Sequence, residues 1–373
     1  MADKTVTALP AAAAMTSADL FPITQGGNSR KATGQQVINL IPSMGLFSKV
    51  DMWSVAFTLP TSSTVSLKAG TAIALPSGLV ISFPSLTVVQ MPSLTAGTDY
   101  AIYLCADGTV RADANFSAPT GFSTSTSRQI GGFHYAPGGN AAAQAGGDTT
   151  PVINPYSLWD LKWRPKCADP RGMALVAGAF WADIYLLGVA YTANGTSRNN
   201  VAIASGSAPP KIPLLFGGNG TTAYGELNWW DASEVMASVG KRLPRYAEFS
   251  AAVYGTTENV SRGNDPVTSG LGTTNAGSSK ADNTLTSKWG IIQATGCYDV
   301  WGADLGGPYA AASWAADPAS RGASYELPNG ALLGGYWASG AGSGSRSSDW
   351  LLAPSTSSGV LGARGVCDHL SHV

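Results

Sequence analysis

Cysteine and histidine side chains are the residues of this chain that can carry nucleophilic or metal chemistry, and the chain has four cysteines and three histidines. Cys367, Asp368 and His369 follow one another directly. A nucleophile needs its base within hydrogen-bonding reach and a third group that orients the base. Because adjacent side chains point apart on most backbones, we expect Cys367 to pack inside the protein and Asp368 or His369 to make a local hydrogen bond. The alternative is a nucleophile with its base.

The cysteines stand far apart in the sequence and form no C-x-x-C pair. This spacing is poor material for a zinc site or a redox pair. We expect free, buried thiols at Cys105, Cys167, Cys297 and Cys367, with a disulfide between Cys297 and Cys367 as the alternative.

Standard catalytic and cofactor motifs are missing. The histidines cannot form H-E-x-x-H, Lys241 is followed by Arg242 where a phosphate-binding loop needs Ser or Thr, and no G-x-G-x-x-G opens a helix after a strand. Asp and Asn gather in residues 255–283, in an order that does not follow the EF-hand loop. The sequence therefore predicts no catalytic residues, no cofactor and no metal, and leaves a calcium site in 255–283 open.

The composition excludes two classes of partner. Charged residues make up 12% of the 373 residues and the net charge is −1, so no basic field is available for nucleic acid or an anionic membrane. No segment approaches the length of about 18 apolar residues that a membrane-spanning helix needs, and the first residues lack a signal-peptide core. We expect a protein made in the cytoplasm without a signal peptide, which leaves the cell by lysis or in a particle if it works outside.

Short strands and tight turns dominate the pattern. Gly26-Gly27 indicates a hairpin, Pro76-Ser77-Gly78 a turn between alternating stretches, and Asp107-Gly108 a hairpin between two alternating runs. Another hairpin is expected at Asn194-Gly195. Residues 49–168 therefore predict an antiparallel β-sandwich.

Two short helices are expected in the second half of the chain. Asp231 caps the first, Glu234 completes a capping-box-like pattern and Gly240 ends it. Pro244 opens the second, which Gly255 stops. Strands then resume at residues 288–296.

The aromatic residues mark a domain boundary. Every tryptophan except Trp53 lies at or after Trp159. We predict an α+β, mainly β chain of three parts, residues 1–48, 49–168 and 169–373.

Several blocks of the last part carry a resemblance. They are GKRLPRYAEFSAA (240–252), GCYDVWGADLGG (296–307), Arg321-Gly322, ALLGGYW (331–337), SGSR (343–346) and GARGV (362–366). In this order they resemble the formylglycine-generating-enzyme branch of the C-type lectin fold. Residues 95–121, 131–147, 169–189 and 362–370 are in addition similar to the phage tropism determinants, receptor-binding proteins diversified by a diversity-generating retroelement. The similarity runs from about residue 49 to the end, and the first 48 residues depart from it.

The resemblance implies a homotrimer at the tip of a tail fibre in the virion. Residues 1–48 would be a β-prism-like module for attachment to tail-fibre or particle proteins and for trimerisation, 49–168 a β-sandwich, and 169–373 a C-type lectin domain for host attachment. This domain would bind a host cell-surface receptor, a protein more than a glycan because the calcium-and-sugar motifs are missing, and would catalyse nothing. The alternatives are a formylglycine-generating-type oxidase, against which Cys367 counts because it has no cysteine partner in that region, and a structural particle decoration protein.

The resemblance also assigns a hypervariable region, at about residues 334–366. The receptor-binding positions it implies are Tyr336, Ala338, Gly340, Gly342, Asp349, Leu351, Leu352, Thr356, Ser358, Val360 and Leu361. All hold residues that can be reached when one or both of the first two bases of an AAC codon are replaced. The implied scaffold is Trp337, Arg346, Trp350 and Arg364. Positions 336–342 and 356–360 alternate with period two, so extended backbone would place each set on one face, with Trp337 facing the core.

Overall fold

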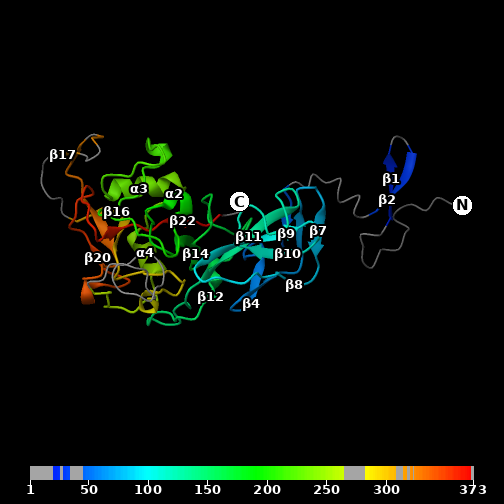
Figure 1. The fold of residues 1–373 in the computed structure, drawn as a ribbon, viewed down its shortest axis with the longest axis horizontal. Coiled ribbons are helices and arrows are strands. Elements are labelled where there is room, and N and C mark those ends of the chain that lie inside the picture. The colour runs from blue at the N-terminus through cyan, green and yellow to red at the C-terminus, as the bar shows by residue number, and fades with distance from the viewer. Residues whose placement is uncertain are drawn as a thin grey trace.

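The computed structural model describes residues 20–25, 28–33, 45–263, 282–307, 314–316, 320–321 and 323–370. The described residues from 45 onward form two lobes that lie end to end, one from the first half of this part of the chain and one from the second (Figure 1). Short strands predominate in both lobes and the few helices are short, so the predicted mainly β fold is confirmed. No helix among these residues is long and apolar enough to cross a membrane.

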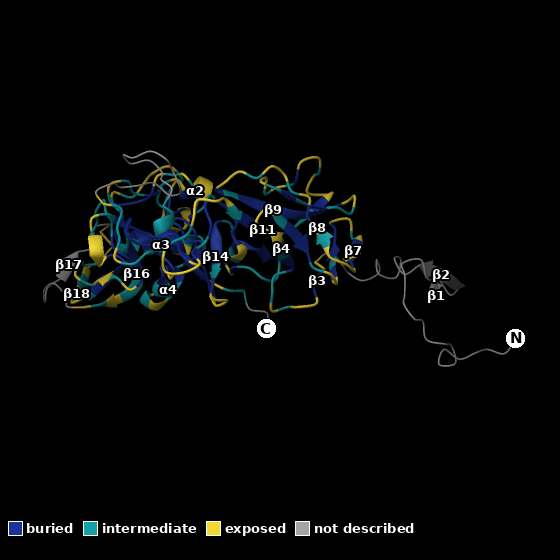
Figure 2. Ribbon diagram, turned by 90° about the horizontal axis from the view of Figure 1, so that it is seen from below, coloured by how far each residue is buried: buried dark blue, intermediate teal, exposed yellow. Residues whose placement is uncertain are grey.

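The first lobe consists of three small sheets around one core. The sheet orders are β3-β6-β7, β4-β5-β8 and β10-β9-β11-β12, with β13 also paired to β11. The strands are β3 (Phe47–Ser48), β4 (Phe57–Thr61), β5 (Thr64–Leu67), β6 (Thr71–Ala74), β7 (Val80–Phe83), β8 (Thr87–Val88), β9 (Thr98–Cys105), β10 (Val110–Asp113), β11 (Ser127–Ala136), β12 (Val152–Ile153) and β13 (Trp159–Asp160). β9 and β11 are almost wholly buried, whereas the rim loops are exposed (Figure 2).

The turns of this lobe follow the local chemistry of the sequence. Asp107 accepts a hydrogen bond from the Thr109 amide at 3.0 Å, and Gly108 adopts φ 82°, which closes the predicted hairpin between β9 and β10. Gly78, with φ 84°, turns the chain between β6 and β7 as predicted. A Cβ on Gly131 of β11 would lie 2.4 Å from the Phe57 ring, so this glycine lets two sheets approach each other closely.

The N-terminal hairpin predicted at Gly26-Gly27 is confirmed by its strands. β1 (Leu20–Gln25) pairs with β2 (Asn28–Thr33) antiparallel, with Gln25 opposite Asn28. The remainder of the predicted β-prism-like module, apart from β3 and its approach, lies outside the described residues.

The second lobe mixes sheets with short helices. Its sheets are β14-β15-β22, β20-β19-β16-β21 and β17-β18, and only the β16–β21 pair among these is parallel. The strands are β14 (Met173–Val176), β15 (Phe180–Asp183), β16 (Asp299–Gly306), β17 (Trp314–Ala316), β18 (Ala323–Tyr325), β19 (Asn329–Leu333), β20 (Ser348–Asp349), β21 (Leu361–Gly362) and β22 (Val366–Asp368). The helices are η2 (Pro155–Ser157) at the junction, then α2 (Tyr191–Asn194), η3 (Leu214–Phe216), α3 (Trp229–Ser238), α4 (Tyr246–Ala252), η4 (Asn283–Leu285) and η5 (Gly340–Gly342).

Three local predictions for this lobe are wrong. Asn228, not Asp231, caps α3; Asp231 is the third helical residue and completes the capping box with Asn228. At Asn194-Gly195 the chain ends the one-turn helix α2 instead of a hairpin, because the Gly195 amide bonds back to the Tyr191 carbonyl. Residues 288–296 form turns and no strand, and they are buried from Gly290 onward. The second predicted helix is confirmed as α4.

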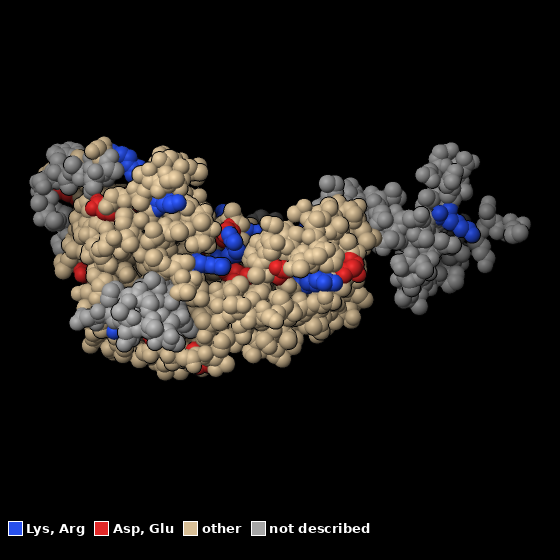
Figure 3. Space-filling view, viewed as in Figure 1, with Lys and Arg blue, Asp and Glu red and all other residues tan. Residues whose placement is uncertain are grey.

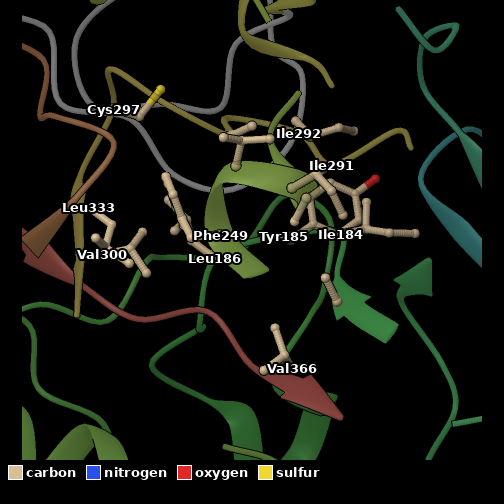
Figure 4. Packing of buried hydrophobic residues seen from close by; sticks show 14 of the residues in the cluster. Ile184, Tyr185, Leu186, Phe249, Ile291, Ile292, Cys297, Val300, Leu333 and Val366 are labelled. Carbon is tan, nitrogen blue, oxygen red and sulfur yellow. The ribbon is translucent and has the colours of Figure 1, made fainter. Parts of the chain in front are cut away.

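The core of the second lobe joins its sheets to α4. Phe249 of α4 packs in one cluster with Val300 of β16, Leu333 of β19 and Val366 of β22, and all four side chains are buried (Figure 4). Burial of each such side chain contributes about 1.5 to 3 kcal/mol. Strands from both main sheets of this lobe are thereby held at fixed positions beneath the segment that connects β19 to β22.

A buried polar contact joins the two lobes. His134 of β11 lies 2.8 Å from an Asp99 carboxylate oxygen through Nδ1 and 2.9 Å from the Tyr185 hydroxyl through Nε2. Asp99 also accepts the Gly172 amide at 3.1 Å. Because Tyr185 and Gly172 belong to the second lobe, this chain of hydrogen bonds fixes one lobe against the other.

Candidate functional site

The segment 334–366 crosses the end of the second lobe between β19 and β22. It includes η5, then β20, which pairs with β19, then β21, which pairs with β16. Between these elements the chain is irregular. The segment is therefore tied to the lobe at a few points and displays the stretches between them.

The implied receptor-binding positions differ in exposure. Leu351 is 71% exposed, and Ala338, Gly340, Gly342 and Asp349 are exposed too. Half-buried positions are Tyr336, Leu352, Thr356, Ser358 and Val360. Leu361 is only 1% exposed and belongs to a core cluster. Leu361 thus lies beneath the surface that the other positions form, contrary to its predicted place on that surface.

The predicted period-two geometry is wrong. The Ser339 amide bonds to the Tyr336 carbonyl and the Gly342 amide to the Ser339 carbonyl, so residues 336–342 form consecutive turns with η5. Gly340 has φ 55°, a left-handed conformation that glycine adopts without strain. Residues 356–360 lie in no strand either. The alternating receptor-binding positions therefore lie on turns and irregular backbone, not on one face of a strand.

Two tryptophans attach this irregular segment to the core. Trp337 is half-buried, and its ring lies 5.2 Å from the Tyr298 ring in an edge-to-face arrangement. Trp350 packs against β16, where a Cβ on Gly306 would come within 3.0 Å of the indole. The two indole rings thus pack against the core, and their exposed neighbours do not take part in this packing.

The two arginines of the implied scaffold have different places. Arg364 is 1% exposed, and its guanidinium donates hydrogen bonds of 2.8 to 3.1 Å to the carbonyls of Asp183, Ile184, Ile292 and Gln293. Burial lowers its pKa to about 10. Arg346 is exposed, and it is its carbonyl that accepts the Tyr246 hydroxyl at 2.9 Å. Arg364 therefore belongs to the buried frame, whereas Arg346 contributes an exposed backbone contact.

Two supporting residues escaped the sequence analysis. Glu258 accepts hydrogen bonds from the Ser345 amide at 2.8 Å and the Ser345 hydroxyl at 2.5 Å. The Ser261 hydroxyl donates to the Trp337 carbonyl at 2.9 Å and accepts the Gly340 amide at 3.0 Å. Both residues lie within the polar insert of residues 255–283, near its start, and no local motif distinguishes them.

The electrostatics of the site centre on one half-buried carboxyl group. Burial, and secondly the charge of Asp349, raise the pKa of Asp299 to about 7. Elsewhere charges are sparse: on the face in Figure 3 they form scattered groups, one of them near the junction of the lobes. The described residues on the face shown in Figure 3 therefore form no extended basic patch.

The cysteine and histidine side chains that the structure describes make packing contacts and structural hydrogen bonds. All four cysteines are free and buried, as predicted. His369 accepts the Trp181 indole N–H at 2.8 Å, a hydrogen bond to a residue 188 positions away and not the local one that the sequence predicted. The Cys367 sulfur, however, is not without a cysteine neighbour, because it accepts the Cys167 amide at 3.0 Å. His372 lies outside the described residues.

A metal site is likewise not formed by the part of the chain that the structure describes. No group of three or more His, Cys, Asp or Glu side chains there could hold an ion. Residues 264–281, most of the insert for which calcium was left open, lie outside the described residues.

Two half-buried tryptophans and a buried arginine form a frame that displays an irregular segment of small residues. Such an arrangement defines a scaffold protein that presents a surface. Comparisons with known proteins identify the family to which this scaffold belongs. Residues 55–160 match the family described as Mtd second domain. The tail fiber receptor-binding protein of Bordetella phage BPP-1 is 54% identical over 324 residues, 87% of this chain and 84% of that protein.

Solved structures agree. The Major Tropism Determinant U1 variant is 54% identical, covers 87% of this chain and 86% of its own, and superposes with a TM-score of 0.84. The P3c variant is 51% identical over 93% of this chain and 90% of its own, with a TM-score of 0.85. The chain belongs to the major tropism determinant family.

Proposed function

We propose that this protein is a tail-fibre receptor-binding protein that attaches a phage to its host through the surface formed by residues 336–360. The observation that carries the proposal is the 54% identity to a tail fiber receptor-binding protein along most of both chains, joined to the exposure of the implied positions. Leu361 is left out of the proposed surface because it is buried. The function is binding, and we assign no catalytic role.

The geometry supports a surface that tolerates exchange. Ala338, Asp349 and Leu351 project from turns or from the two-residue strand β20, whereas Trp337 and Trp350 fill the space beneath them. Substitution of exposed residues away from core contacts usually changes the free energy of unfolding by less than about 0.5 kcal/mol. New side chains at these positions therefore leave the fold intact.

The exposed part of the surface fits a protein partner. Leu351 supplies an apolar anchor and Asp349 a charge, while the small residues 338–342 leave shallow space for a protruding side chain. Such a surface has few strong contacts. A homotrimer, with residues 1–48 as its attachment and trimerisation module, would multiply them: linked sites gain roughly 10² to 10⁴ in overall affinity.

A cell-binding assay with the purified full chain tests the proposal. Labelled protein is titrated onto host cells, and its ability to block phage adsorption is measured. Leu351→Ser should reduce both readings at least tenfold with an unchanged melting temperature. Leu215→Ser is the matched control, because Leu215 is 78% exposed and lies outside the proposed surface.

Three outcomes separate the possibilities. Loss with Leu351→Ser alone supports the proposal. Equal binding by both variants and the parent would place the receptor site elsewhere. Absence of cell binding by the parent, together with normal assembly into particles, would assign the protein to structural decoration. Light scattering of the same samples gives the oligomeric state, with a trimer expected.

A further inference from the structure

Cys167 and Cys367 lie together in the fold although 200 positions separate them. The amide nitrogen of Cys167 is 3.0 Å from the Cys367 sulfur, which places that sulfur within reach of the Cys167 side chain. The Cys167 sulfur in turn lies 3.6 Å from the Met173 sulfur. Both cysteine side chains are buried, with exposures of 3% and 4%.

Backbone pairing sets this approach. Pro165 and His369 form an antiparallel bridge, flanked on each side by one hydrogen bond of 2.9 Å between residues 164–166 and 368–370. Beyond this bridge the chain bends, and the Cys167 amide turns toward the Cys367 side chain. Disulfides span Cα separations of about 4.4 to 6.8 Å.

The protonation of the two sulfurs is unequal. The Cys367 pKa is lowered to about 7, chiefly by a hydrogen bond from the Cys167 thiol, and further by backbone amides and the charge of Lys241. The same contact, together with burial, raises the pKa of Cys167. One thiolate beside one thiol is the arrangement from which thiol–disulfide exchange starts.

We propose that Cys167 and Cys367 form a reversible disulfide that ties the segment between the two lobes to the last strand of the second lobe. A small disulfide such as oxidised glutathione is the oxidant. The Cys367 thiolate attacks one of its sulfurs and releases one glutathione thiolate, leaving a mixed disulfide. Cys167 then loses its proton and attacks the Cys367 sulfur, which releases the second glutathione. Two protein thiols are oxidised and one glutathione disulfide is reduced.

The disulfide would form after the protein has left the reducing cytoplasm. Cytosolic thiol pools keep such pairs reduced, whereas oxidising surroundings allow them to close. Closure would link residue 167 to residue 367 and so constrain the unfolded chain over nearly the whole second lobe. Folding and assembly in the cell would thus precede the bond, and the bond would stabilise the protein afterwards. This inference does not depend on the receptor-binding proposal.

Peptide mapping of the full chain tests it. The purified protein is equilibrated in glutathione buffers of increasing oxidised fraction, blocked with an alkylating agent and cut with trypsin. Cleavage after Lys166, Arg171 and Arg364 gives peptides 167–171 and 365–373. We expect these two peptides to appear as one linked species, and two of the four thiols to remain titratable. The melting temperature should rise on the order of 5 °C and fall again on reduction.

Variants of single cysteines supply the control. Cys105→Ser should still form the link, since Cys105 lies in a different buried cluster, whereas Cys167→Ser should keep its three thiols at every redox ratio. Four titratable thiols in the parent protein at the most oxidising ratio, or a link through Cys105 or Cys297, would overturn the proposal. The parent's peptide map decides the matter even where a variant folds poorly.

Discussion

Glu258 holds Ser345 by two hydrogen bonds, one to its amide and one to its hydroxyl. Ser345 lies between two exposed stretches of the proposed receptor surface, residues 338–342 and 349–351. A residue more than eighty positions away in sequence therefore fixes how that surface is presented.

Removal of this carboxylate should loosen the surface without unfolding the lobe. In Glu258→Ala the Ser345 amide and hydroxyl lose their partner, a local cost of about 1 to 3 kcal/mol. We expect receptor affinity to fall while the global melting temperature changes by only a few degrees. Hydrogen exchange at residues 343–347 checks the local effect. Glu258→Gln, which keeps one acceptor, should lie between the parent and the alanine variant.

Two leucines of the same segment should respond in opposite ways. Leu361→Ala removes a core side chain and should cost about 2 to 4 kcal/mol in unfolding free energy. Leu351→Ala should cost less than about 0.5 kcal/mol because its side chain is exposed. Urea titration of both variants measures the difference. Equal costs would contradict the described burial of Leu361.

Arg364 should be among the least replaceable residues of the chain. Arg364→Met keeps much of the volume but removes the guanidinium that binds four carbonyls, of which that of Ile184 keeps a second donor, the Ile292 amide. Each buried group left unsatisfied costs about 1 to 3 kcal/mol. We expect loss of soluble folded protein or a destabilisation above about 3 kcal/mol, followed by circular dichroism. Arg346→Met, at an exposed arginine of the same segment, should behave like the parent.

The carboxyl group of Asp299 should make stability depend on pH. Its pKa is about 7 in the fold, against an ordinary value of 3.8, so the folded state binds this proton more tightly than the unfolded state. The group therefore favours folding fully below about pH 4, and this contribution is lost as the pH rises through 7. Melting temperatures at pH 5 and pH 8 should differ less in Asp299→Asn than in the parent. Asp349→Asn should reduce the difference too, since the charge of Asp349 contributes to the shift.

Local features of the fold could be predicted wherever a short stretch determines its own structure. Asp107-Gly108 forms its hairpin because an Asp side chain caps the turn and glycine adopts positive φ. Asn228 and Asp231 compete for the same cap, and the sequence offers no means of choosing between them; the structure places Asn228 at the cap because the Asp231 carboxylate can reach back to it. The order of residues along the chain therefore does not decide where α3 begins.

The site was harder to predict because its geometry depends on contacts distant in sequence. Period two in residues 336–342 indicates a strand face only if a neighbouring strand pairs with it, and here internal turns replace that pairing. The resemblance implies for Leu361 the same variable role as for its neighbours, yet pairing of β21 with β16 draws it into the core. The approach of Cys167 to Cys367 likewise follows from tertiary pairing and from no spacing in the sequence.

The segment that begins at Gly334 ends at Arg364, and both ends are fixed by groups outside it. Gly334 packs against the Phe249 ring, so closely that a Cβ would lie 2.7 Å from it, and Arg364 binds carbonyls of residues 183–184 and 292–293. The residues displayed between these ends make neither contact. A segment of equal length from a relative that also keeps Ser345 and Leu361 can therefore be grafted between them, which makes this lobe a ready carrier for libraries of new binding surfaces.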